Sequence, residues 1–128
     1  MTEQELHQLI KTRLVPDIIR LGEFDASDAY SRRYNQHYEY KCISKPHPRI
    51  MLEKQKYDDI INLPNIRYVI SIPTGIWSFN LQTLPPFEWQ EIYVHHSTFY
   101  NREIDYINKT CTFLPLGWGR NISHLLLD

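Results

Sequence analysis

The sequence predicts a mixed α/β (α+β) fold, in which helices pack against a mixed sheet that contains an antiparallel hairpin. The first observation is the order of the patterns: a helical period, two short extended segments, a second helical period, then several strands. The second is size and composition, because 128 residues with 42% hydrophobic and 13% aromatic content can bury a core. We therefore expect residues 1–128 to form a single domain.

The first element is predicted to be a helix that begins at Thr2. Thr2 and Glu5 match a capping box, in which each side chain accepts a hydrogen bond from the other residue's backbone N–H. Apolar residues follow at helical spacing at positions 6, 9, 10 and 14. Pro16 breaks or kinks this helix, and residues 17–21 are expected to add one more turn before Gly22.

Residues 24–30 and 37–43 are predicted to form a hairpin whose polar turn spans 32–36. Side chains alternate faces along a strand, so Glu39 and Lys41 point to one face, and Tyr38, Tyr40 and Cys42 to the other. If Asp28 lies on the paired strand, two carboxylates and one ammonium converge. Such a trio can hold a hard divalent cation and activate a water beside it.

The remaining chain is predicted to supply one more helix and several strands. Residues 50–63 have the pattern of a helix that stops at Pro64, and residues 66–72 form a β-branched, nearly apolar run typical of a buried central strand. Residues 76–81 alternate between apolar and polar side chains from Trp77 onward, the pattern of another strand. We expect further strands at 91–95 and within 104–113, with a turn at 108–109, and an irregular tail from residue 117 onward.

Charge is distributed unevenly along the chain, although the net charge is only −1. Residues 1–30 carry three basic and six acidic side chains, and residues 57–128 carry four basic and seven acidic ones, so each segment has a net charge of −3. Residues 31–56 carry seven basic and two acidic side chains, a net charge of +5. A basic rim around an acidic centre suits a polyanionic substrate approached through a metal, and chance clustering on a solvated face gives the same count.

The sequence contains no apolar run near the ~20 residues that a membrane-spanning helix needs. The first residues are acidic, unlike the basic and then apolar start of a signal peptide. We therefore expect a cytoplasmic protein. Its two cysteines, Cys42 and Cys111, are expected to be free thiols in the core.

The element order, with an acid ahead of a Glu-x-Lys triplet, resembles the PD-(D/E)XK nuclease-like superfamily and its restriction-endonuclease-like core. Asp28 corresponds to the first acid, and Glu39-Tyr40-Lys41 to the triplet. Residues 53–58, 67–71 and 75–81 look like segments of small phage- or mobile-element-borne members. The likeness covers roughly residues 2–82, and the literal Pro-Asp dipeptide is absent because Ser27 precedes Asp28.

This resemblance implies a nuclease that hydrolyses phosphodiester bonds in DNA, or less readily RNA, with Mg²⁺ or Mn²⁺. Asp28, Glu39 and the Tyr40 carbonyl are the implied metal ligands, and Lys41 is implied to position or deprotonate the attacking water. Basic residues around the site are implied to hold substrate phosphates. They are Arg32, Arg33, Lys45, Arg49, Lys54 and Lys56.

Several alternatives stay open at the level of sequence. Asp25 competes with Asp28, and in a strand the two face opposite ways; we prefer Asp28 because it directly precedes Ala29. Glu5 and Glu53 are accessory acid candidates, and helix capping also explains Glu5. The alternative function is a catalytically inactive protein of this fold that binds nucleic acid or a protein partner. A homodimer is compatible with the size of the chain, since so small a chain rarely encloses a duplex alone, but no residue pattern indicates one.

Overall fold

The computed structural model describes residues 1–95 and 106–128, with side chains for 1–93 and 108–128. Its larger sheet has six strands in the order β1-β2-β3-β5-β6-β9, and a second sheet has three in the order β4-β8-β7. The strands of the larger sheet are β1 (Ile19–Arg20), β2 (Ala29–Ser31), β3 (Gln36–Cys42), β5 (Arg67–Ile72), β6 (Gly75–Asn80) and β9 (Arg120–Asn121). The smaller sheet contains β4 (Arg49–Glu53), β7 (Gln90–His95) and β8 (Tyr106–Pro115).

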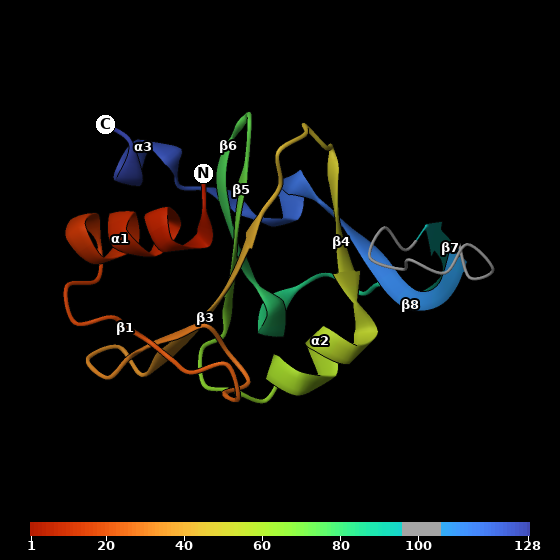
Figure 1. The fold of residues 1–128 in the computed structure, drawn as a ribbon, viewed down its shortest axis with the longest axis horizontal. Coiled ribbons are helices and arrows are strands. Elements are labelled where there is room, and N and C mark those ends of the chain that lie inside the picture. The colour runs from red at the N-terminus through yellow and green to blue at the C-terminus, as the bar shows by residue number, and fades with distance from the viewer. Residues whose placement is uncertain (96–105) are drawn as a thin grey trace.

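The larger sheet separates two layers (Figure 1). Helices α1 (Glu3–Arg13) and α3 (Ser123–Leu126) lie on one side of it, and helix α2 (Lys54–Ile60) lies with β4 and β8 on the other. Each side has its own cluster of buried apolar residues, with Leu6 and Ile10 in the first and Ile60 and Leu114 in the second. The arrangement confirms the predicted mixed α+β class.

The first helix begins where the capping pattern predicts. Thr2 adopts an extended backbone and is the N-cap, and Thr2 and Glu5 exchange two hydrogen bonds of 3.1 Å. Leu6, His7 and Ile10 face the sheet because residues three and four apart share one side of a helix. The predicted extra turn over 17–21 is wrong, since Ile19 and Arg20 form the short edge strand β1 against β2.

The predicted hairpin is confirmed, with a first strand that is shorter than expected and a second strand that is shifted by one residue. Strand β2 pairs antiparallel with β3, with Ala29 opposite Tyr38 and Ser31 opposite Gln36. Strand β3 also pairs in parallel with β5, the predicted central strand, which has β6 on its other side. Strand β3 pairs with β2 only over its first residues, 36–38. It then continues to Cys42 with β5 as its neighbour.

The prediction of a helix over 50–63 is wrong in its first part. Residues Arg49–Glu53 form β4, and the helix spans only Lys54–Ile60. Ile50 and Leu52 are fully buried while Met51 is only partly buried, a period of two that fits a strand. Strand β4 gains its hydrogen-bond partner from β8, some sixty residues further along, so local periodicity did not reveal it.

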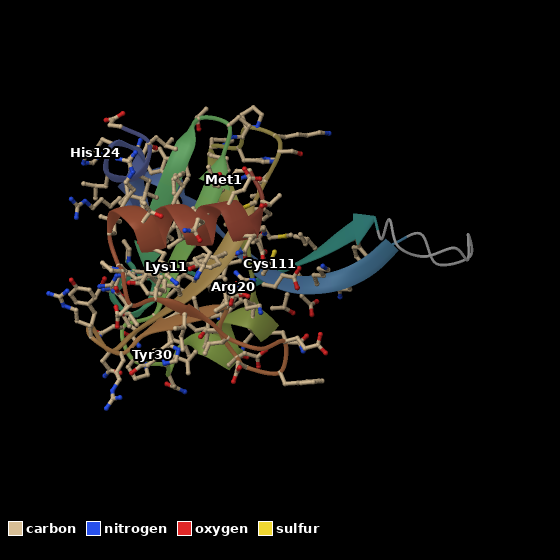
Figure 2. All side chains as sticks on the ribbon, turned by 60° about the vertical axis from the view of Figure 1, so that its left-hand side comes forward. Met1, Lys11, Arg20, Tyr30, Cys111 and His124 are labelled. Atoms are coloured by element: carbon tan, nitrogen blue, oxygen red, sulfur yellow. The ribbon has the colours of Figure 1, made fainter. Side chains whose placement is uncertain are left out.

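Two further predictions need correction. Residues 108–109 lie inside the continuous strand β8, and the tail is more regular than expected, because it holds the 3₁₀ turn η2 (Leu116–Trp118), β9 and α3. The expected start of a strand at 104–105 lies outside the described residues. Strands β7 and β8 form a long ribbon that projects from the body of the protein (Figures 1 and 2).

Other sequence expectations can be compared directly. The cysteines are free, with Cys111 buried as expected and Cys42 only partly buried. The short 3₁₀ turn η1 (Leu81–Thr83) follows β6 and leads into the proline-containing linker. Among the described residues, the structure has no helix whose length and hydropathy would suit a membrane crossing.

A core substitution in β4 tests the correction made to this segment. Leu52 is fully buried between β4 and the larger sheet, so Leu52→Ala should lower the free energy of unfolding by about 2–5 kcal/mol. Urea unfolding measures this loss, with Gln55→Ala on the exposed side of α2 as the control. A loss no larger than that of the control would contradict the packing of β4.

Candidate active site

The site lies where β2 begins and β3 extends beyond it. The Asp28 N–H donates to the Tyr38 carbonyl at 3.0 Å, and the Asp28 carboxylate accepts the Tyr40 N–H at 2.8 Å. The side chain of Asp28 thus continues the hydrogen bonding between the two strands after the backbone of β2 has diverged. This bond fixes the first acid beside the Glu-x-Lys triplet.

Glu39 is the buried acid of this site. It is 6% exposed, and one carboxylate oxygen, Oε2, lies 3.0 Å from the Lys56 ammonium on α2. The other oxygen, Oε1, is buried and has no hydrogen-bond partner among the side chains and backbone that the structure describes. Burial, with the nearby negative charge of Asp28, raises the pKa of Glu39 to about 7 despite the opposing effect of Lys56.

Lys41 faces the same side of β3 as Glu39, as predicted, but its ammonium does not bind either acid. It donates to the Met51 carbonyl on β4 at 3.1 Å. Burial lowers the pKa of Lys41, and the charge of Glu53 opposes that shift. The Lys41 ammonium is therefore poorly solvated, and deprotonating it costs less free energy than deprotonating an exposed lysine.

Glu39 and Lys41 open onto a pocket of about 200 Å³ between β3, β4 and α2. Glu53 lies at its edge and makes a 2.7 Å ion pair with Lys109 of β8. Tyr68 of β5 supplies a buried wall, and burial raises the pKa of its hydroxyl. The pocket is lined by Glu39, Tyr40, Lys41, Met51, Glu53, Lys56 and Tyr68.

The donor set suits a magnesium ion. Within the parts of the chain that the structure describes, no three Asp, Glu, His or Cys side chains gather as a metal cluster. Mg²⁺ needs fewer protein ligands, since it keeps several waters and uses one or two carboxylates. The unpartnered Glu39 Oε1 is an available ligand. The Tyr40 carbonyl points with its N–H toward Asp28, because both groups of a strand residue face one neighbouring strand.

The two other acid candidates from the N-terminal part have different surroundings. Asp25 accepts a hydrogen bond of 2.7 Å from the Gly22 N–H and so stabilises the turn before β2. Glu5 is exposed and binds the Thr2 N–H, which is the capping explanation. Of the other acid candidates, Asp28 lies beside Glu39, and Glu53 lines the same pocket as Glu39.

The predicted basic residues do not form one cluster. Lys56 contacts Glu39, whereas Lys54 pairs with Asp58 at 2.7 Å on another side of α2. Arg32 and Arg33 lie at the β2–β3 turn, at one end of β3. Lys45 and Arg49 lie beyond its other end, where the Arg49 guanidinium is 5.0 Å from the centre of the Phe113 ring.

Three residues near the site were missed by sequence reasoning. Glu3 on α1 lies close enough to Asp28 for that charge to add to desolvation in raising the Glu3 pKa. His7 is buried, with its Nδ1 2.8 Å from the Tyr40 hydroxyl, and the guanidinium of Arg20, labelled in Figure 2, lies 5.4 Å from the Tyr40 ring centre. Glu3 and His7 are four residues apart, so the shared helix face was the available signal.

Comparison with known proteins supports the fold. No family model and no curated protein matches the sequence. Among solved structures, Hjc, a Holliday junction resolvase from the archaeal hyperthermophile Archaeoglobus fulgidus, is similar with a TM-score of 0.60. The alignment covers 97% of this chain and 91% of that chain at 14% sequence identity. At this identity the likeness shows a shared fold alone, which agrees with the predicted mixed α+β class.

The raised pKa of Glu39 predicts a pH-dependent stability. The folded protein keeps a proton on Glu39 up to a pH of about 7, whereas the unfolded chain loses it near 4.5. The stabilisation is therefore full below that lower value and is lost as pH rises through 7, by on the order of 2–3 kcal/mol.

Urea unfolding in EDTA between pH 4.5 and 8.5 measures this loss. Glu39→Gln should flatten the curve and be more stable than the parent at pH 8, because it removes a charge that is costly to bury. Asp25→Asn serves as the control and should keep the parent slope. Parallel curves for the parent and Glu39→Gln would show that Glu39 is ionised across the range.

Proposed function

We propose that this chain is a divalent-metal-dependent nuclease that acts on DNA. The observation that carries the proposal is the pairing of Asp28 with the buried Glu39, whose Oε1 has no partner within the described part of the chain. Keeping two carboxylates together at low solvent exposure costs free energy, and a divalent cation between them removes that cost. Such an arrangement is typical of a functional site rather than of a stabilising one.

The fold similarity supports DNA as the substrate. The similar structure is that of a Holliday junction resolvase, a protein whose name states action on branched DNA. We extend this to the present chain as a proposal, with four-way DNA junctions placed among the substrates to test and RNA as a less favoured one. We further propose that the protein acts in the cytoplasm of a cell that hosts a phage or mobile element. The same proposal includes assembly as a homodimer.

Each residue of the site has a role in this chemistry. Asp28, Glu39 and the Tyr40 carbonyl would hold Mg²⁺ or Mn²⁺. When bound, the ion supplies charge neutralisation at the phosphate and a water of lowered pKa. Lys41 would orient that water as an ammonium or, as the neutral amine that its lowered pKa favours, would accept a proton from it. Tyr68 and Met51 limit the entry of bulk water from the side of the pocket.

Two contacts favour a second candidate function. The Lys41 ammonium donates to the Met51 carbonyl, and the Lys56 ammonium already lies on Glu39. A site with its charges paired in this way also suits a protein that binds DNA or another protein without cleaving. The same assay separates this alternative from the nuclease.

Cleavage assays test the proposal. Four-way junction, linear duplex and single-stranded DNA, and RNA, are incubated with Mg²⁺, Mn²⁺ or EDTA. We expect metal-dependent cleavage of DNA that falls by roughly 100-fold or more in Glu39→Gln and Asp28→Asn, since each removes a metal ligand.

Asp25→Asn is the matched control, because it changes a neighbouring carboxylate that lies in a turn. Its activity should stay close to that of the parent. Equal activity in the parent and Glu39→Gln would contradict the assigned site. No cleavage of any substrate by a folded parent, together with retained DNA binding, would favour the non-catalytic candidate.

A further inference from the structure

Lys56 reaches Glu39, the buried member of the acid pair, from helix α2. Its ammonium lies 3.0 Å from Glu39 Oε2, and the charges of both Glu39 and Asp28 favour its protonated form. Because Lys56 and the fully buried Ile60 are four residues apart, they share one side of α2, which faces the sheet. The cation is therefore directed into the site by the packing of the helix.

A positive charge beside two carboxylates is also what a divalent ion provides. Glu39 is 6% exposed, and among the described residues Lys56 is the one ammonium in hydrogen-bond contact with it, since Lys41 donates to the Met51 carbonyl. Lys56 is thus the cation that compensates the acid pair in the structure described. Its side chain is 43% exposed, so it can leave Glu39 for solvent without disturbing the core.

From this geometry we propose that Lys56 is an internal competitor of the metal, which compensates Asp28 and Glu39 in the metal-free protein and is displaced when a divalent ion binds. The inference rests on the proposed metal site, but it concerns metal affinity rather than cleavage. Two cations that lie close to one carboxylate repel each other, so the presence of one weakens the binding of the other. The displaced ammonium remains beside the pocket, where a phosphate oxygen of the substrate would attract it.

The experiment compares Lys56→Met with Lys54→Met. Methionine keeps the unbranched stem and the helix propensity of lysine but removes its charge. Lys54 is a matched control, because it lies on the same helix, has the same 43% exposure and also pairs with a carboxylate, that of Asp58. Binding of Mn²⁺ is measured at pH 8 by electron paramagnetic resonance of the free ion.

We expect Lys56→Met to bind Mn²⁺ about tenfold tighter than the parent, because the ion no longer has to break an ion pair to a buried acid. Lys54→Met should bind like the parent. Thermal unfolding gives a second readout. In EDTA the Lys56→Met protein should melt below both others, and added Mn²⁺ should raise its melting temperature more than theirs.

Equal or weaker Mn²⁺ binding by Lys56→Met than by the parent would overturn the inference and leave the proposed nuclease intact. Tighter binding by Lys56→Met without cleavage by the parent would support the inference and count against the nuclease. If none of the three proteins binds Mn²⁺, the competitor role and the metal site are both wrong. Circular dichroism establishes that each variant is folded before these readings are compared.

Discussion

The arrangement of the site depends on one hydrogen bond, from the Tyr40 N–H to the Asp28 carboxylate at 2.8 Å. Strand β2 extends only from Ala29 to Ser31, so the backbone cannot satisfy Tyr40 on that side. The Asp28 side chain replaces the missing backbone acceptor and brings its charge next to Glu39. The Tyr40 N–H requires an acceptor, and because the Asp28 carboxylate supplies it, the two acids lie side by side.

The two faces of β3 explain why the site is both anchored to the core and open to a pocket. Tyr38 and Tyr40 point into the core beneath α1, where the Tyr40 hydroxyl lies 2.8 Å from the buried His7. Glu39 and Lys41 point to the other face, toward β4 and α2. The strand is held from one side and presents its charged residues on the other, a division that the period of two imposes. The cost of the buried acid is compensated locally by Lys56.

Prediction from sequence succeeded where the signal was local. The capping box at Thr2, the apolar run of β5 and the alternation around Glu39 each specify their structure within a few residues. It failed at residues 49–53, where the partner of the strand is β8. Because residues 49–53 form a strand, Glu53 lies at the end of β4 beside the pocket and not within a helix as predicted. The predicted basic cluster divided for the same reason, since adjacency along the chain does not bring residues to one face.

The sequence by itself determined the fold class, the hairpin and the sharing of one strand face by Glu39 and Lys41, because these follow from short-range periodicity. The tertiary structure alone decided that Asp28 rather than Asp25 reaches Glu39, that Lys41 binds Met51, and that Lys56 compensates the acids. It also placed Glu3 near the site. These contacts join separate elements, and their distances depend on how α1, α2 and β4 pack on the sheet, which no local pattern encodes.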